Sequence, residues 1–297
     1  VLFRSALKEY VSLWVTINEP NVYASCGYLE GSFPPGKKDV NAFARVLRNL
    51  VRGHALAYRA VHDIQKTARV GTAINYRAFW PARGWMPLDK TMTNIGHQIY
   101  NNAFAGALVN GKLNLVVKRA AIPEAAGTQD FIGVNYYTGD KITFVLNPEK
   151  LFYERKVPEG ALMSPTGFIA DIPEGMFQAL KWAKGFKLPI IVTENGVEDP
   201  DDLMRPRYLV EHIHQVWRAV NFSFPIKGYF QWSLVDNFEW ERGWTQRFGL
   251  WGLDVEKQLR IRRKSVDVYA AICKENGITS EMVEQYVPEL FPVLFPG

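Results

Sequence analysis

Cysteine and histidine are scarce in this chain of 297 residues, and the few that occur do not form a metal-binding pattern. The 2 cysteines, Cys26 and Cys273, lie far apart, and neither belongs to a C-x-x-C pair. The 5 histidines fall in stretches with helical periodicity, and none lies at ligand spacing from a cysteine. We therefore expect free thiols in a reducing compartment and no metal site.

Long apolar runs and glycine-rich phosphate loops are also lacking. No apolar run approaches the roughly 18 residues of a membrane-spanning helix, so we expect no membrane partner. No β-rich run is followed by a glycine-rich turn, which argues against a dinucleotide enzyme, and we expect no cofactor. The formal charge is +5, but the one dense basic run, Arg260 to Lys264, is typical of a solvated loop. We expect no nucleic-acid partner.

The sequence has neither an initiator methionine nor a leader peptide. It opens with Val1-Leu-Phe-Arg-Ser5 in a helical pattern, so we expect a fragment whose N-terminal part is missing. Since the pattern of the two cysteines indicates free thiols in a reducing compartment, we expect a cytoplasmic location.

Five short runs of β-branched and aromatic residues are present, and each is nearly continuous in apolar side chains. This pattern predicts parallel strands that are buried on both faces. The runs are Leu13–Ile17, Val70–Tyr76, Asp130–Tyr137, Ile190–Thr193 and Gly228–Leu234.

Each predicted strand is followed by a helical pattern, and strict alternation predicts a parallel sheet with helices outside it. The predicted helices span 42–65, 90–110, 173–187, 206–222 and 265–276, the last closed by Gly277 as its C-cap. Residues 138–172 are predicted to be a long loop that frames a site.

Five units do not close a barrel of eight, so an open doubly wound sheet and a barrel cut short both remain as readings. Polar or aromatic residues stand at the C-terminal end of every predicted strand, which places a shared site at one rim and favours the barrel. These ends are Asn18-Glu19, Asn75-Tyr76, Asn135 to Tyr137, Glu194-Asn195 and Trp232-Ser233.

Glu19 and Glu194 repeat one arrangement, because each is an acid at the end of a predicted strand. Pro20 biases Glu19 away from the helical region, and the Asn-Gly turn after Glu194 ends that strand. A buried salt bridge or a helix-capping acid remains the alternative for Glu19 alone. Two such residues form a pair across one rim, and glycoside hydrolysis needs a protonated acid and an ionised carboxylate.

The sequence resembles glycoside hydrolase family 1, the β-glucosidase family, from about Tyr10 to Asn276. The resemblance is carried by Thr16-Ile-Asn-Glu-Pro20, Asn135-Tyr-Tyr137, Thr193-Glu-Asn-Gly196 and Trp232-Ser-Leu-Val-Asp-Asn-Phe-Glu-Trp240. It implies a (β/α)8 TIM barrel of which only the C-terminal five β/α units, strands 4 to 8, are present. Residues 1–297 would then form a single partial catalytic domain.

The resemblance implies that Glu19 is the general acid/base and Glu194 the nucleophile of a retaining β-glycosidase. We expect their carboxyl groups to lie roughly 5 Å apart. We also expect Glu194 to be ionised, with its charge raising the pKa of Glu19.

Contacts to the sugar are implied for further residues. Asn18 would bind the 2-hydroxyl, Asn135 would line the site near the acid/base, and Tyr137 would orient Glu194. Trp232 would form the platform under the ring, and its bond to Ser233 is often a cis peptide in this family.

Glu239 would accept the 4- and 6-hydroxyls, Trp240 would reach the 3- or 4-hydroxyl, and Phe248 would line the sugar site. Plain packing remains the alternative for Trp240 and Phe248. Because a carboxylate at Glu239 repels phosphate, the expected substrates are terminal unphosphorylated β-D-glucosides, β-galactosides or β-fucosides, including aryl and alkyl β-glycosides.

The sequence departs from the family at its N-terminus, where the first three strands and an arginine that pairs with the nucleophile have no counterpart. Without that arginine, the ionised state of Glu194 is expected to lose support. We expect unpaired sheet edges near Val15 and Phe230, and an unstable or aggregating chain with little activity. A separate N-terminal segment or a homo-oligomer would cover these edges. A non-catalytic carbohydrate-binding remnant is the alternative function, and binding without turnover would identify it.

Overall fold

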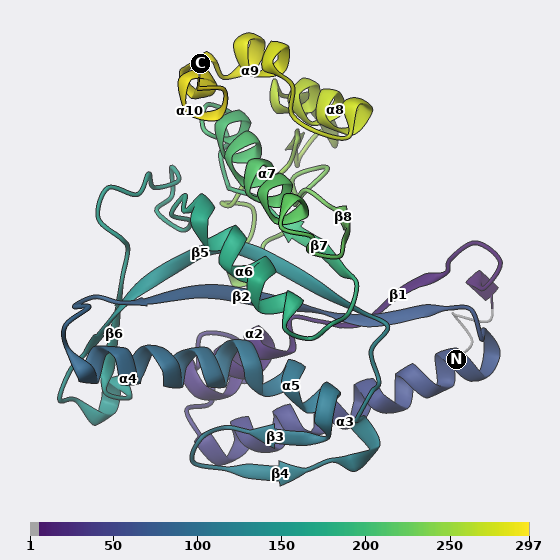
Figure 1. The fold of residues 1–297 in the computed structure, drawn as a ribbon, viewed down its shortest axis with the longest axis vertical. Helices are drawn as coiled ribbons and strands as arrows, with labels where there is room; N and C mark the ends of the chain where they lie inside the picture. Colours follow the sequence, from purple (N-terminus) through teal and green to yellow (C-terminus); the bar gives the residue numbers. More distant parts are fainter. Residues whose placement is uncertain (1–5, 297) are drawn as a thin grey trace.

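The computed structural model describes residues 6–296, which form an α/β fold around a parallel sheet (Figure 1). Five parallel strands follow one another in the order β1-β2-β5-β7-β8, and β6 pairs antiparallel with β5. Their bounds are β1 Leu13–Asn18, β2 Arg69–Pro81, β5 Phe131–Phe144, β6 Tyr153–Lys156, β7 Ile190–Asn195 and β8 Ile226–Tyr229. Four of the predicted strands are therefore confirmed, whereas the fifth, expected over Gly228–Leu234, lies earlier in the chain and overlaps β8 only at Gly228 and Tyr229.

Helices connect the strands. Figure 1 shows α3, α4 and α5 below the long strands β2 and β5, with α7 to α10 above them. The α-helices are α2 Pro20–Ser25, α3 Val40–Ile64, α4 Pro87–Gly96, α5 Ala103–Asn110, α6 Pro173–Lys184, α7 Arg205–Asn221, α8 Ser265–Glu275, α9 Ser280–Tyr286 and α10 Phe291–Leu294. The π-helical turns are η1 Cys26–Glu30 and η2 His97–Asn102.

Two small hairpins and four single 3-10 turns complete the fold. The hairpins pair β3 with β4 and β9 with β10. Their bounds are β3 Lys112–Asn114, β4 Arg119–Ala121, β9 Trp251–Asp254 and β10 Leu259–Arg262. The 3-10 turns are η3 Pro123–Ala125, η4 Pro148–Lys150, η5 Trp240–Arg242 and η6 Pro288–Leu290.

The structure corrects several details of the predicted elements. The helix expected over 90–110 begins at Pro87 and is interrupted by η2. The loop expected over 138–172 is in part sheet, because β5 continues to Phe144 and pairs with β6. Helix α8 is capped by Asn276 in the left-handed region (φ 50°) and not by Gly277, since asparagine tolerates that conformation. The helix expected at Val1–Ser5 lies outside the described residues.

The strand register brings the carboxyl ends of the strands to one edge. Asn75 on β2 pairs with Asn135 on β5, and Asn135 pairs with Glu194 on β7. On the other side of β2, the Glu19 backbone nitrogen donates to the Ala73 carbonyl at 2.9 Å. The polar ends of four neighbouring strands therefore lie in a row.

The main core lies between the sheet and helices α3, α5 and α6. Leu47, Phe104 and Leu180 from these helices pack with Ile74 and Val134 of the sheet, and all five are almost fully buried. This apolar layer fixes the strands that carry the polar row.

Within residues 6–296, no pairing joins β8 back to β1, so the sheet is open along both outer strands. Val15 on β1 is 42% exposed and Phe230, just after β8, is 53% exposed, as the sequence predicts for sheet edges. No helix of the described residues is long and apolar enough to cross a bilayer.

Candidate active site

Glu19 stands at the junction of β1 and α2. Its backbone adopts the left-handed region (φ 47°, ψ 54°), and Pro20 begins the helix. Although Glu19 occupies the N-cap position, its side chain makes no capping hydrogen bond. It also forms no ion pair that the described residues provide, so both structural alternatives for this acid are excluded there. Its carboxylate turns to the polar row instead.

Two amides hold one oxygen of the Glu19 carboxylate. Asn75 Nδ2 and Asn135 Nδ2 each donate to Glu19 Oε1 at 2.9 Å. Burial raises the pKa of Glu19, and the two amide donors oppose that rise because they favour the ionised form. The expected rise is therefore present, but burial is its main cause and not the charge of Glu194.

Glu194 is the last residue but one of β7 and lies beside three polar side chains. The Tyr137 hydroxyl donates to Glu194 Oε2 at 2.6 Å, and the neighbouring side chains of Asn18 and Asn135 also favour its ionised form. Burial first, and the nearby Glu19 next, raise the pKa of Glu194 to about 8. The ionised state of Glu194 therefore loses support in this chain, as the absence of the family's arginine predicts, and no cation among residues 6–296 pairs with it.

Asn135 joins the two carboxylates. Its Nδ2 donates to Glu19 Oε1 at 2.9 Å, and the same side chain helps to lower the pKa of Glu194, which in turn feels the charge of Glu19. Thr193 Oγ1 donates to Asn135 Oδ1 at 2.5 Å, which turns the Asn135 amide nitrogen toward the acids. The same nitrogen donates to Asn18 Oδ1 at 3.1 Å. The sequence-predicted pair is thus brought together on one face of the sheet.

Trp232 follows β8 and lies beside the end of β7. Its backbone nitrogen donates to the Asn195 carbonyl at 2.9 Å, and the Trp232-Ser233 peptide is cis, as the resemblance implies. A Cβ at Gly196 would lie 1.9 Å from the Trp232 carbonyl oxygen. Only glycine therefore fits at this position, and the approach sets Trp232 next to the strand that carries Glu194.

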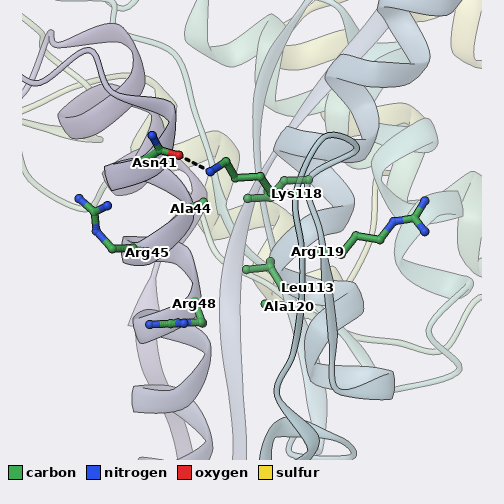
Figure 2. A pocket seen from close by; sticks show the side chains of 9 residues that line it. Asn41, Ala44, Arg45, Arg48, Leu113, Lys118, Arg119 and Ala120 are labelled. Atoms are coloured by element: carbon green, nitrogen blue, oxygen red, sulfur yellow. Dashed lines mark hydrogen bonds between the residues drawn. The ribbon is translucent and has the colours of Figure 1, made fainter.

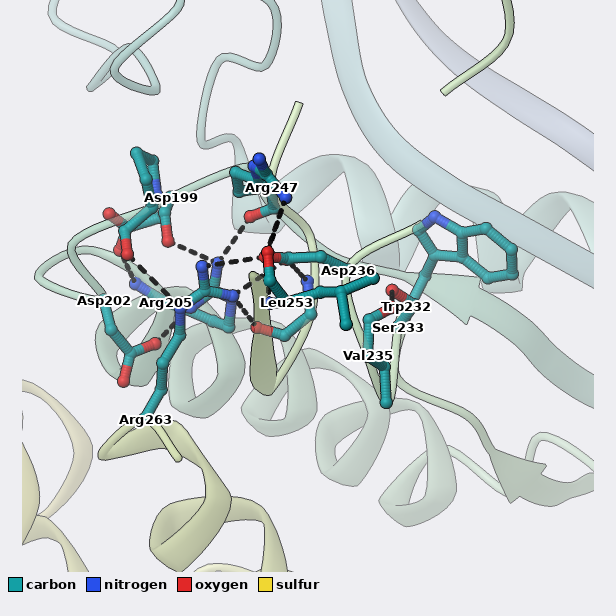
Figure 3. Close-up of polar contacts among 12 residues, drawn as sticks. Asp199, Asp202, Arg205, Trp232, Ser233, Val235, Asp236, Arg247, Leu253 and Arg263 are labelled. Carbon is teal, nitrogen blue, oxygen red and sulfur yellow. Dashed lines mark hydrogen bonds and ion pairs between the residues drawn. The ribbon is translucent and has the colours of Figure 1, made fainter. Parts of the chain in front are cut away.

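The segment after Trp232 is tied down by a buried carboxylate, Asp236 (Figure 3). Asp236 accepts two hydrogen bonds from Arg263, at 2.9 and 3.1 Å. It also accepts from the backbone nitrogens of Gly249 at 2.8 Å and Leu253 at 3.2 Å. Asp236 therefore closes the loop 236–249, which carries Glu239 and Trp240.

A second buried ion pair joins this loop to the loop that follows Glu194. Arg205 is fully buried, pairs with Asp202, and donates to the carbonyl oxygens of Asp199 and Arg247 (Figure 3). The Asp199 backbone nitrogen donates to the same Arg247 carbonyl at 2.9 Å. The two walls of the site are therefore braced against each other.

The remaining predicted site residues, Glu239, Trp240 and Phe248, differ in how far they are exposed to solvent. Glu239 lies in electrostatic range of Glu19, and burial, followed by Glu19, raises its pKa to about 7. Trp240 is 73% exposed. Phe248 is 2% exposed and packs edge-on against the Tyr137 ring, with centroids 5.9 Å apart. Phe248 does not line an open sugar site as expected, since its burial makes it a packing residue behind Tyr137.

Sequence reasoning assigned no role to Asn75, Thr193, Tyr100 or Asp236, although all four orient groups of the site. Asn75 lies near the end of a predicted strand, as Asn135 does, so this position could have marked it as a site residue. Thr193 and Asp236 stand inside the quoted motifs. Tyr100 lies in a helix, and no local pattern marks it because its contact depends on the turn η2.

A separate cavity of about 210 Å³, lined mainly by basic and apolar side chains, lies between α3 and the β3–β4 hairpin (Figure 2). Lys118 reaches across it to Asn41, whereas Arg45 and Arg48 extend away from it. It is lined by none of the carboxylates described above. In the described part of the chain, no group of three or more His, Cys, Asp or Glu side chains is arranged to hold a metal ion.

Comparison with known proteins points to one family. A sequence model described as "Glycosyl hydrolase family 1" matches residues 1–278. Among curated proteins, a β-galactosidase of Pyrococcus woesei is 31% identical over 93% of this chain and 60% of its own length. The β-glucosidase A of Thermotoga maritima is 34% identical over 94% of this chain and 66% of its own length.

Solved structures agree with the sequence matches. A β-glycosidase from Pyrococcus horikoshii superposes with a TM-score of 0.88 and 34% identity, covering 97% of this chain and 67% of that one. The chain therefore spans about two thirds of the length of the relatives that it matches.

Proposed function

The chain belongs to glycosyl hydrolase family 1, and from this premise we propose that it carries the catalytic carboxylates of a retaining β-glycosidase. The observation that carries the proposal is the pair Glu19 and Glu194, which reach one amide, Asn135, from different strands. The electrostatic effect of Glu19 on Glu194 supports a short separation, which suits a mechanism in which one acid attacks carbon directly, because an intervening water needs more room.

The proposed reaction has two balanced steps. In the first, a Glu194 oxygen bonds to the anomeric carbon and the glycosidic C–O bond breaks. The electron pair of that bond leaves with the departing oxygen, which takes the proton of Glu19. In the second, water gives a proton to Glu19 and bonds to the anomeric carbon, while the ester electrons return to Glu194.

The proposed substrates are terminal unphosphorylated β-D-glucosides, with β-galactosides and β-fucosides as further candidates, and aryl or alkyl aglycones. Asn18, on the nucleophile side, would bind the 2-hydroxyl, and Trp232 would lie under the ring. Glu239 would accept hydroxyl donors and repel a phosphate, most strongly above pH 7 where it is ionised. Trp240 is free to reach a hydroxyl because its ring is exposed.

The raised pKa of Glu194 predicts weak turnover by this chain near neutral pH. With its pKa raised to about 8, Glu194 is mainly protonated at pH 7. A cation beside Glu194 would lower that pKa and increase the ionised fraction.

We further propose that the five parallel strands correspond to strands 4 to 8 of the (β/α)8 barrel of the family. The open edges at β1 and β8 then fit a complementing N-terminal segment or a second copy of the chain. Either arrangement would cover Val15 and Phe230. Either could also supply a cationic side chain beside Glu194.

The stereochemistry of hydrolysis tests the function. Proton NMR of an aryl β-glucoside reaction at pH 8.5 is expected to show β-glucose as the first product. Glu19→Gln and Glu194→Gln should each abolish turnover of an alkyl β-glucoside, whereas Glu284→Gln, an exposed acid on α9, should not. The α-anomer as first product contradicts the proposal, and sugar binding without turnover supports the carbohydrate-binding remnant instead.

A further inference from the structure

Asn75 stands between Glu19 and a tyrosine from a distant helix. Asn75 Nδ2 donates to Glu19 Oε1 at 2.9 Å, and the Tyr100 hydroxyl donates to Asn75 Oδ1 at 3.0 Å. The three side chains form a linear chain of hydrogen bonds from η2 through β2 to the end of β1.

The Tyr100 hydroxyl decides which way the Asn75 amide faces. Because Oδ1 accepts from Tyr100, the amide nitrogen is directed at Glu19. The backbone around this pair is held as well, since Asn21 Nδ2 donates to the carbonyl of Asn75 at 2.7 Å and to that of Tyr100 at 3.1 Å. Asn21 is 2% exposed, so the clamp is sheltered from water.

The turn that carries Tyr100 is fixed to β2 by its neighbour. Asn101 is fully buried and bonds both backbone groups of Arg77, accepting from its nitrogen at 3.0 Å and donating to its carbonyl at 2.9 Å. The π-helical turn η2 therefore has one register relative to β2. This register places the Tyr100 hydroxyl next to Asn75.

We propose that Tyr100 is a positioning residue for Glu19, which fixes the Asn75 amide so that Glu19 Oε1 is occupied by donors and Oε2 carries the proton. Oε1 accepts from both Asn75 and Asn135, and an oxygen that accepts two amide hydrogens has little room for a proton of its own. Oε2 is then the oxygen that gives a proton to a leaving group. The catalytic part of this inference rests on the proposed function, whereas the coupling of Tyr100 to Glu19 does not.

Removing the Tyr100 hydroxyl lets the Asn75 amide turn over. The turned amide places Oδ1 against Glu19 Oε1, and two acceptors at this distance repel unless Glu19 is protonated. Tyr100→Phe should therefore raise the pKa of Glu19. The other titratable groups that face Glu19 are Glu194 on β7, Tyr137 on β5 and Glu239 after β8, and the substitution leaves all three in place.

Carbon-13 NMR of glutamate δ-carboxyls measures this directly in the full chain, with Glu19→Gln identifying the Glu19 signal. Tyr100→Phe is expected to move the titration midpoint of Glu19 up by about one pH unit, the equivalent of one charge-assisted hydrogen bond. Tyr76→Phe is the matched control, because Tyr76 is the next residue on β2 and no hydrogen bond of its hydroxyl is found among the described residues. Circular dichroism checks that each variant is folded.

A double variant keeps the inference testable if Tyr100→Phe alone disturbs packing. Asn75→Leu removes the relay, so Asn75→Leu with Tyr100→Phe should titrate like Asn75→Leu alone. An unchanged midpoint in Tyr100→Phe, or additive shifts in the double variant, overturns the inference. Neither of these measurements depends on turnover. If Glu19→Gln hydrolyses substrate as well as the parent chain, the proposed function is wrong but the coupling of Tyr100 to Glu19 can still hold. If the Glu19 midpoint does not move, the coupling is wrong but the proposed function can still hold.

Discussion

The Tyr137 hydroxyl donates to Glu194 Oε2 over 2.6 Å, from a strand that pairs directly with the strand of Glu194. A hydrogen bond of this length to a carboxylate favours the ionised form. Around Glu194, burial and Glu19 work in the opposite direction. Tyr137 is therefore one of the few described groups that support the charge that the proposed nucleophile needs.

Replacing Tyr137 by phenylalanine should move the pKa of Glu194 further above 8, because one stabilising donor is lost. At pH 7 we expect kcat/KM to fall about 10-fold to 100-fold, as the loss of a hydrogen bond to a charged group implies. A pH profile of kcat/KM checks this, since the acidic limb should shift to higher pH. Tyr10→Phe, at a residue that is 82% exposed, serves as the control. A profile that drops without shifting would contradict the assigned role.

Folding stability should decrease as pH rises across the neutral range. The Glu194 carboxyl has an ordinary pKa of 4.5 and a folded-state pKa of about 8, so the folded chain binds its proton more tightly than the unfolded chain. Its contribution to stability is complete below pH 4.5 and is lost as pH rises through 8. Glu239, with a pKa raised to about 7, acts in the same direction.

Urea unfolding at pH 5 and pH 8.5 measures this effect. We expect a loss of about 1–3 kcal/mol in the free energy of unfolding at the higher pH, and a smaller loss in Glu194→Gln. Equal losses in the two proteins would show that Glu194 is not the titrating group.

Asp236→Asn should weaken the loop 236–249. The substitution removes the buried carboxylate that holds the partly buried Arg263 through two hydrogen bonds, which is expected to cost about 3–5 kcal/mol. Thermal unfolding measures this cost. Hydrogen exchange should also increase at the Gly249 backbone amide, which donates a hydrogen bond to Asp236. Asp267→Asn breaks the exposed bidentate pair with Arg262 and should cost under about 1 kcal/mol. Similar costs for the two variants would rule out the buried pair as the brace.

Gly196→Ala should destabilise the chain, because the added Cβ would meet the Trp232 carbonyl oxygen at 1.9 Å and backbone must move. We expect a cost of at least about 1–3 kcal/mol. Gly53→Ala is the matched control, since Gly53 lies in α3 with open space around its Cβ. That variant should gain about 0.5–1 kcal/mol. If Gly196→Ala lowers the free energy of unfolding no more than Gly53→Ala does, Trp232 does not approach β7 as closely as described.

Sequence patterns located the strands because the central part of each is nearly continuous in apolar residues, as in Ile190 to Val192. They failed where tertiary contacts override local signals. Residues 138–144 read as loop because Thr138, Gly139 and Asp140 are polar or small, yet they continue β5, with Asp140 paired to Arg77. Local sequence cannot report such a partner on a neighbouring strand.

The two carboxylates were predictable because each ends a strand, and parallel strands end at one rim. The absent arginine predicted that the pKa of Glu194 rises, but local sequence could not show that burial is the main cause, since burial depends on the whole fold. The same limit applies to Phe248, whose motif position suggests a sugar contact although the fold buries it behind Tyr137.

Covalent trapping tests most directly whether Glu194 is the nucleophile. A 2-deoxy-2-fluoro β-glucoside with a dinitrophenyl leaving group needs no acid, so labelling at pH 8.5 depends on an ionised Glu194 alone. Peptide mass spectrometry is expected to place the glycosyl ester on Glu194 and to find none in Glu194→Gln. A label on Glu19 or Glu239, or a folded chain that takes up no label, would contradict the proposed mechanism.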